Sequence, residues 1–320
     1  MAQNKNSKIH HWWPVGLQQY WADSNKELSW IEPDGTIRKK KPANRKIGYT
    51  RHGHTIFRGS VWESSFESEF DIDDEVHRIV AGIRNLKPFG RNPSEFFALL
   101  RLLQKKDRTL RDMCKFYHLD RKLHRNLLLL LYSLLIRSPA ARSRYEGYPG
   151  MIGLPSDEDT GKSNMVQNYH IAKKLCHNGL ISNQYFVLLH SRRKKFIFGD
   201  GCLDWLSNGL IANRINGRVL IPLTPHVCVY FCTPLTMRIT PSCASLSVAP
   251  WMVDWVNEIT QIYSKDKLFF LGKPPKMIDA FQQQKFLEHK DKTDPLIDML
   301  DEIIGARTQR GVLAMGLSGL

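Results

Sequence analysis

The chain has 320 residues, 42% of them hydrophobic and 24% charged, so it can bury a full hydrophobic core in one large domain, and disorder along its whole length is excluded. The formal net charge of +15 at pH 7 indicates a polyanionic partner, most simply nucleic acid. The six cysteines include no Cys-x-x-Cys pair, which excludes a zinc ribbon and a disulfide framework and favours reduced, buried thiols.

Two adjacent histidines and two tryptophans precede a proline near the N-terminus, in the segment His10–Pro14. Histidine is the commonest metal ligand and titrates closest to neutral pH, so the pair is a candidate for metal binding or proton transfer. The alternative is a turn at the start of a strand, with one histidine exposed. The first eight residues lead into no apolar stretch, so we expect no secretory signal and a cytoplasmic protein.

Short strands are expected next along the chain. Pro33-Asp34-Gly35 is typical of a turn between two strands, which predicts a hairpin over residues 27–38. Residues 51–57 predict a further strand that presents His52 and His54 on one face, close to the first histidine pair.

From Val61 to Ile136 the apolar spacing is helical. Residues 60–83 carry a net charge of −6, and Glu63 and Glu67 lie four residues apart where we expect a helix to begin. These acids either share a cation or form a solvated helix face. Residues 84–144 carry 15 Lys and Arg against 4 Asp and Glu, so this segment holds most of the excess positive charge.

Residues 109–127 follow the apolar spacing of a helix-turn-helix, in which basic residues at the start of the second helix contact nucleic acid. The basic residues at that point are Arg121, Lys122 and Arg125. The alternative is a pair of helices in a basic-faced core. The second helix, capped by Asp120, runs into a buried leucine run that is far shorter than the roughly 20 residues of a membrane span, so no membrane partner is expected.

Three arginines surround the proline that ends this leucine-rich helix. Arg137, Arg142 and Arg144 either neutralise the terminal carbonyl groups of the helix or hold a phosphate.

The stretch 147–162 is rich in Gly, Pro, Asp and Ser. It forms either a linker that divides 1–146 from 163–310 or a long loop inside one domain. We expect one composite domain over 1–310 and a flexible tail over 311–320.

Strand patterns dominate after a helix that is predicted over residues 164–190. Short apolar strands are expected at 195–198, 218–221 and 227–232, followed by a closing helix at 252–263. The whole chain therefore predicts an α+β fold with a small N-terminal hairpin, a central helical segment and a C-terminal sheet of short strands.

Asp200 lies between Gly199 and Gly201 at the end of an apolar strand. Glycines allow a close backbone approach, so this carboxylate is a candidate ligand-binding group, and the alternative is a plain turn. Cys228 and Cys232 with His226 offer soft metal ligands, but the fourth ligand of a structural zinc site is missing nearby.

The order of the histidine, arginine, aspartate and proline motifs along the chain resembles that of a bacterial family of unknown function. Members of that family open with His-His-Tyr-Val-Pro, carry Arg-Thr-Pro-x-x-Arg near mid-chain, and later have Phe-Ile-Thr-Ser-Asp followed by Pro-Leu-Ser-Pro. The corresponding segments here are His10–Pro14, Arg137–Arg142, Phe196–Asp200 and Pro222–Pro225. Trp12 and Trp13 replace Tyr-Val in this chain. The resemblance covers residues 9 to about 265 and supplies no reaction, because the family is defined without one.

The resemblance implies that six side chains belong to one site: His10, His11, Glu63, Arg137, Arg142 and Asp200. His10, His11, Glu63 and Asp200 would hold a divalent metal ion such as Mg, Mn or Zn, with His10, His11 and Asp200 catalytic, while the arginines grip phosphates. We therefore expect a metal-dependent nuclease or phosphodiesterase that acts on DNA or RNA, in a bacterial defence or toxin setting.

Three alternatives remain open at this point. A His-Asn-His metal site would use His11, Asn44 and either His52 or His54. A non-enzymatic nucleic-acid-binding or regulatory protein would use the helix-turn-helix-like segment 109–127. A small-molecule hydrolase with the same site would act on nucleotides but not on polymers.

Overall fold

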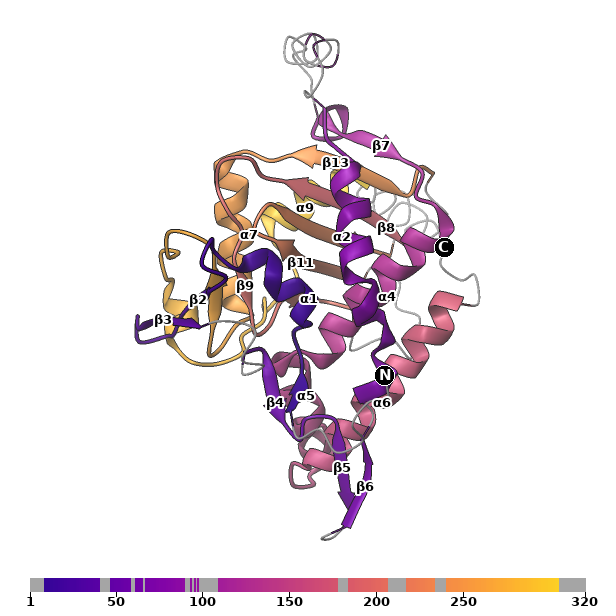
Figure 1. Ribbon diagram of the computed structural model, residues 1–320, viewed down its shortest axis with the longest axis vertical. Helices are drawn as coiled ribbons and strands as arrows, with labels where there is room; N and C mark the ends of the chain where they lie inside the picture. The colour runs from indigo at the N-terminus through magenta and orange to yellow at the C-terminus, as the bar shows by residue number, and fades with distance from the viewer. Residues whose placement is uncertain are drawn as a thin grey trace, which may run out of the picture.

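The computed structural model describes residues 9–40, 47–58, 61–65, 67–89, 109–177, 184–206, 217–233 and 240–304, together with Pro93, Glu95 and Phe97. Helices and strands both contribute extensively, which confirms the expected α+β class (Figure 1). The predicted tail 311–320, Asn44 and most of the predicted helical residues 90–108 lie outside the described residues.

The core of the protein is a six-stranded mixed sheet. Its strands, in spatial order, are β10 (Leu203–Asp204), β11 (Arg218–Thr224), β12 (Val227–Cys232), β8 (Tyr185–His190), β13 (Cys243–Ser247) and β7 (Lys115–Tyr117). Neighbouring strands are antiparallel, except that β13 runs parallel to β8. Every residue of β8, β11 and β12 is buried, and such continuous apolar runs are typical of strands covered on both faces.

Helices cover both faces of this sheet. Figure 1 shows α2 (Val76–Asn85) and α4 (Arg121–Arg137) on one face and α9 (Pro295–Ile304) on the other. Successive side chains of a strand point to opposite faces, so Phe231 of β12 meets Tyr132 of α4, whereas Tyr230 donates a hydrogen bond to Asp301 of α9.

The leucine run forms a buried helix, as predicted. All residues from Asn126 to Arg137 in α4 are buried, and the Asp120 carboxylate caps the helix by accepting the Leu123 N–H at 2.8 Å. Ser138 separates α4 from α5 (Pro139–Gly147) and caps the second helix by accepting the Ala141 N–H. The predicted 147–162 linker contains η6 (Tyr148–Ile152) and the first turn of α6 (Glu158–His177), and α6 packs against both α4 and α5.

A second, four-stranded antiparallel sheet joins strands near the N-terminus to strands from residues 198–270. Its order is β3 (Ile37–Lys40), β2 (Leu28–Ile31), β14 (Leu268–Phe270) and β9 (Phe198–Gly199). The predicted N-terminal hairpin is confirmed as β2 and β3. Trp13 packs its ring 4.5 Å from that of Phe198 and 4.6 Å from that of Phe269, so the indoles beside the histidine pair are core residues.

The remaining strands form two small hairpin-like sheets. β1 (Ile9–His11) pairs with β4 (Tyr49–Arg51), and β5 (Thr55–Arg58) pairs with β6 (Val61–Ser65). The predicted strand 51–57 is therefore two strands with a turn at His52–His54. The prediction that a helix begins at Val61 is wrong, because these β-branched and aromatic residues pair with β5.

Short helices complete the architecture. They are α1 (Val15–Gln18), η1 (Gln19–Trp21), η3 (Glu67–Glu69), η4 (Asp71–Glu75) and α8 (Asp279–Gln282). The closing helix expected at 252–263 is confirmed as α7 (Pro250–Ile262).

The helix-turn-helix predicted over 109–127 is not present. Its first helix is replaced by η5 (Arg111–Met113) and the strand β7, because residues 115–117 pair with β13 and form an edge strand of the main sheet. The helix predicted over 164–190 is also wrong in its second half. α6 ends at His177, and residues 185–190 form β8 at the centre of the main sheet.

The main sheet and α9 are joined by a buried ion pair. Arg218 donates to the Asp301 carboxylate from Nε at 2.8 Å and from Nη2 at 2.6 Å, and the Tyr230 hydroxyl donates to the same carboxylate at 2.5 Å. Only 2% of Asp301 is exposed to solvent, so this carboxylate depends on its protein partners.

Asp301→Ala is expected to lower the free energy of unfolding by about 3–5 kcal/mol, because it leaves the buried Arg218 guanidinium without this carboxylate. Urea denaturation followed by circular dichroism measures the loss. The matched control is Glu302→Ala at the exposed neighbouring position of α9, for which we expect a loss below about 1 kcal/mol. Equal losses in the two variants would show that the ion pair does not hold α9.

Candidate functional site

Four histidines lie near one another at the N-terminal edge of the structure. β1 carries His10 and His11, and the turn between β4 and β5 carries His52 and His54. The predicted closeness of the two histidine pairs is confirmed, whereas the single strand expected to present His52 and His54 on one face is not formed. The His10 Nδ1 accepts a hydrogen bond from the His54 backbone N–H at 2.7 Å, and the two rings stack in parallel with centroids 5.1 Å apart. This bond uses the Nδ1 lone pair of His10, so this nitrogen cannot also bind a metal ion.

Arg137, a predicted phosphate ligand, is engaged inside the protein. Its guanidinium donates to both carboxylate oxygens of Asp73, at 2.9 and 2.7 Å, and lies 4.4 Å from the centroid of the Phe70 ring. It also donates to the His11 carbonyl oxygen at 3.3 Å. Arg137 therefore ties the histidine strand β1 to α4 and η4.

Arg142 and Arg144 also contact carboxylates. Arg142 donates to Glu146 and Glu158, each at 2.6 Å, and Arg144 donates to Asp204 at 2.6 Å and to Glu288 at 3.0 Å. A phosphate would have to displace these carboxylates before either arginine could bind it. In the described part of the chain, these arginines therefore do not form a site that is ready to bind a phosphate.

Two side chains of α6 contact the acidic segment before α2. Lys173 lies 3.1 Å from an oxygen of Asp71 and donates to the Glu69 carbonyl oxygen at 2.9 Å, and His170 contacts the Glu69 carboxylate at 3.2 Å. The Glu63 and Glu67 side chains lie outside the described side chains, although the backbone of Glu63 belongs to β6 rather than to a helix.

Asp200 serves a capping role between β9 and β10. Its two carboxylate oxygens accept the backbone N–H groups of Lys265 and Asp266, at 2.9 and 3.0 Å, in the turn after α7. Burial raises the pKa of this carboxyl to about 6, and the two N–H donors offset only part of that effect.

The glycines on either side of Asp200 are explained by close packing. A Cβ atom on Gly199 would lie 1.8 Å from the Ser264 Oγ, and one on Gly201 would lie 1.9 Å from the Tyr263 carbonyl oxygen. The close backbone approach predicted from the sequence is therefore present, and its partner is the chain after α7.

No group of three or more His, Cys, Asp or Glu side chains is arranged to hold a metal ion among the residues that the structure describes. The ligand set of His10, His11, Glu63 and Asp200 stays a prediction. All six cysteines are free thiols, and burial raises the pKa of Cys114 to about 12, which keeps this thiol protonated at neutral pH.

The basic residues assigned to the helix-turn-helix lie on the first turns of α4. Arg121 and Lys122 are exposed and Arg125 is half-buried. They add positive charge to the surface, but without the first helix they have no helix-turn-helix geometry.

A polar cleft of about 420 Å³ opens beside His52. It is lined by Arg51, His52, Asp157, Glu158, Asp159 and Lys162. Lys162 is 2% exposed and lies 3.0 Å from the Glu158 carboxylate, while Asp157 caps α6 by accepting the Thr160 N–H at 2.8 Å. His52 has a left-handed backbone, with φ of 54°, so its ring is held at the cleft by an unusual turn.

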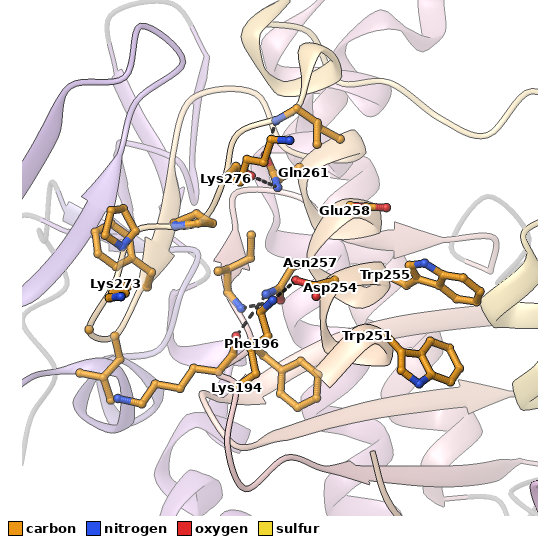
Figure 2. A pocket seen from close by; sticks show the side chains of 18 of the residues that line it. Lys194, Phe196, Trp251, Asp254, Trp255, Asn257, Glu258, Gln261, Lys273 and Lys276 are labelled. Atoms are coloured by element: carbon orange, nitrogen blue, oxygen red, sulfur yellow. Dashed lines mark hydrogen bonds and ion pairs between the residues drawn. The ribbon is translucent and has the colours of Figure 1, made fainter. Parts of the chain in front are cut away.

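A larger groove, of about 860 Å³, runs along α7, and we call it the α7 groove. Figure 2 shows Trp251 and Trp255 extending to one side of the helix, with Lys273 and its loop on the other side. The groove is lined by residues 193–197, Trp251, Asp254, Trp255, Asn257, Glu258, Gln261, residues 270–276 and Ile278. The sequence analysis missed it because its basic loops and its helix are far apart in the chain.

Five cations and two acids line the α7 groove. The cations are Arg193, Lys194, Lys195, Lys273 and Lys276, and the acids are Asp254 and Glu258. Lys194 forms an ion pair with Asp254, whereas the Glu258 residue is exposed beside it on α7. The lining therefore carries a net positive charge.

Two amide side chains of α7 fix the loops on either side of the groove. Asn257 accepts the Ile197 N–H at 3.0 Å and donates to the Lys195 carbonyl oxygen at 3.1 Å. Gln261 donates to the Lys276 carbonyl oxygen at 3.1 Å and accepts the Ile278 N–H at 3.0 Å (Figure 2). Both basic loops are therefore anchored to one helix.

Comparison with models of known protein families finds no match, and comparisons with curated proteins and with solved structures find none either. The resemblance to a bacterial family of unknown function stays a prediction. Within the described ranges, no helix is both long enough and apolar enough to cross a bilayer.

The raised pKa of Asp200 predicts a pH-dependent stability. Between about pH 4 and pH 6 the folded carboxyl keeps a proton that the unfolded chain, with its ordinary pKa of 3.8, has released. The contribution of Asp200 to stability therefore falls as the pH rises through this window, by about 3 kcal/mol in total for a shift of this size.

The difference in unfolding free energy between the wild-type protein and Asp200→Asn, measured by urea denaturation at pH 4.5 and 7.5, isolates this contribution. The variant lacks the titrating group, so the unfolding free energy of the wild-type protein relative to that of the variant is expected to fall at the higher pH. A difference that stays constant with pH would contradict the assignment.

Proposed function

We propose that this protein binds nucleic acid through the α7 groove. The observation that carries the proposal is the placement of two exposed indole rings, Trp251 and Trp255, beside five cations in one groove. Lysine and arginine neutralise phosphates, and exposed aromatic rings offer a stacking surface to bases. The net charge of +15 is in keeping with such a partner.

The choice of the α7 groove over the start of α4 rests on its shape and its aromatic residues. Arg121 and Lys122 form an exposed basic patch on a single helix, whereas the groove combines cations from two anchored loops with indole rings from a helix. Anchored loops lose little conformational entropy when a ligand binds, which favours affinity.

Lys273→Glu/Lys276→Glu is expected to weaken binding of a labelled oligonucleotide by about tenfold or more at 0.1 M salt, and to flatten the dependence of affinity on salt. Fluorescence anisotropy measures both effects. Arg121→Glu/Lys122→Glu is the matched control, because it changes the net charge equally at the start of α4. Equal losses in the two double variants would contradict the assignment to the groove.

Phosphodiester hydrolysis is a second candidate function, and the cleft beside His52 favours it. His52 can transfer a proton, while Arg51 can stabilise negative charge on a phosphoryl group. The carboxylates of Glu158 and Asp159 lie beside Lys162, at 3.0 and 3.6 Å.

His52→Asn is expected to lower the cleavage rate of an end-labelled oligonucleotide by about 10²–10⁴-fold if His52 is a general acid or base. Asparagine tolerates the left-handed backbone at this position, so the turn should persist. Assays with Mg²⁺, Mn²⁺, Zn²⁺ or a chelator reveal any metal requirement, and mononucleotide substrates test a small-molecule hydrolase. Unchanged cleavage in His52→Asn, with His170→Ala as the exposed-histidine control, would exclude this role.

A further inference from the structure

We infer that the α7 groove selects single-stranded over duplex nucleic acid and stacks an unpaired base on Trp251. This inference rests on the proposed function and names the form of nucleic acid that the groove takes. It follows from the arrangement of the two indole rings, from the separation of the rings and the cations, and from the exposed Glu258 on the indole side of α7.

The two tryptophans form one exposed platform rather than a sandwich. Trp251 and Trp255 lie one helical turn apart on α7, with ring centroids 4.9 Å apart and ring planes at 74°. This edge-to-face contact lets one ring support the other, so the rings cannot clamp a base between them. Trp251 is 45% exposed and Trp255 is 37% exposed, so both rings are open to a base and Trp251 offers slightly more of its surface.

Stacking on this platform requires a base whose face is free. In a duplex the faces of each base are covered by neighbouring base pairs, whereas an unpaired base can turn out and stack on an aromatic side chain. A duplex would meet the groove only through its phosphates. Stacking on the indole pair therefore adds to the binding free energy of a single strand and not to that of a duplex.

The cations lie where the backbone of such a strand would run. Figure 2 places Lys273 and Lys276 across α7 from the indole rings, with Lys194 below them. A strand that crosses α7 can direct a base to Trp251 and its phosphates to these lysines. Pro274 and Pro275 stiffen the loop that carries two of the lysines, and Gln261 anchors it.

One more exposed lysine lies near the groove, on the edge strand β3 of the second sheet. The strand register aligns Lys39 with Ser29 and Ser29 with Phe270, so Lys39 lies about two strand spacings, roughly 10 Å, from the start of the basic loop. Lys39 therefore adds a cation at this distance, although the two strands between it and the loop, β2 and β14, are buried.

Glu258 adds a negative charge to α7 on the side of the indole rings (Figure 2). The nearby Asp254 forms an ion pair with Lys194, while Glu258 is exposed on the same helix and repels phosphates. An acidic peptide would use the lysines but would gain nothing from the indole faces. The combination of rings and cations favours a polynucleotide over such a peptide.

The test compares three labelled probes of about 12 nucleotides by fluorescence anisotropy: a single strand, the same sequence as a duplex, and an abasic strand with the same phosphates. DNA and RNA versions of the single strand are both used. We expect the single strand to bind about tenfold more tightly than either of the other probes, because only it offers free base faces.

Two variants separate stacking from charge. Trp251→Ala is expected to weaken single-strand binding by about tenfold and to leave the abasic and duplex probes unchanged, while Trp251→Phe keeps most of the affinity. Glu258→Gln is expected to tighten binding of all three probes by about twofold to fivefold, because it removes a repulsive charge. Tyr148→Ala, at an exposed aromatic residue outside the groove, is the control and should change nothing.

The outcomes distinguish this inference from the proposed function. Equal affinity for the three probes, with loss in Lys273→Glu/Lys276→Glu, would overturn the single-strand inference and keep the nucleic-acid function. If a poly-glutamate peptide bound as tightly as the single strand, the partner would be an acidic protein rather than a nucleic acid. That result would overturn both the single-strand inference and the proposed function. No binding of any probe would also overturn both.

Discussion

The α7 groove depends on side chains that satisfy the backbone of irregular loops. A loop without a helix or strand ladder must find other partners for its N–H and C=O groups. Asn257 and Gln261 supply four of these hydrogen bonds to the two basic loops, and Asp200 supplies two more to the turn that follows α7. The helix therefore fixes the spacing between the lysines and the indole rings.

The buried arginines stabilise the fold, whereas the exposed lysines of the α7 groove are open to a ligand. Buried or half-buried arginines contact carboxylates, as in Arg137 with Asp73 and Arg218 with Asp301, where the planar guanidinium suits a carboxylate. Groove cations such as Lys273 and Lys276 lie in exposed positions instead. A phosphate can reach these lysines without breaking a buried pair, whereas binding at the arginines would require such a break.

Local patterns predicted local structure well and long-range pairing poorly. The leucine run, the 27–38 hairpin and the α7 helix follow from periodicity and turn residues. Residues 115–117 and 185–190 became strands because β13 and β12 pair with them, and such partners cannot be read from a short window. Likewise, Gly199 and Gly201 predicted a close approach, but the sequence could not show that Asp200 would meet the backbone of residues 265 and 266.

Four of the residues that the sequence grouped into one site are linked through residues 137–142, at the start of α5. They are His11, Arg137, Arg142 and Asp200. Arg137, just before this helix, contacts the His11 carbonyl oxygen, and the Ala140 N–H donates to the Asp200 carbonyl oxygen at 3.4 Å. Arg142, one turn further along, contacts Glu158 in the cleft beside His52, and a Cβ on Gly53 would lie 3.1 Å from its Nη1. A segment of six residues thus connects the histidine turn to the turn that ends α7. This junction joins three of the motif segments, His10–Pro14, Arg137–Arg142 and Phe196–Asp200, although they lie far apart in the chain.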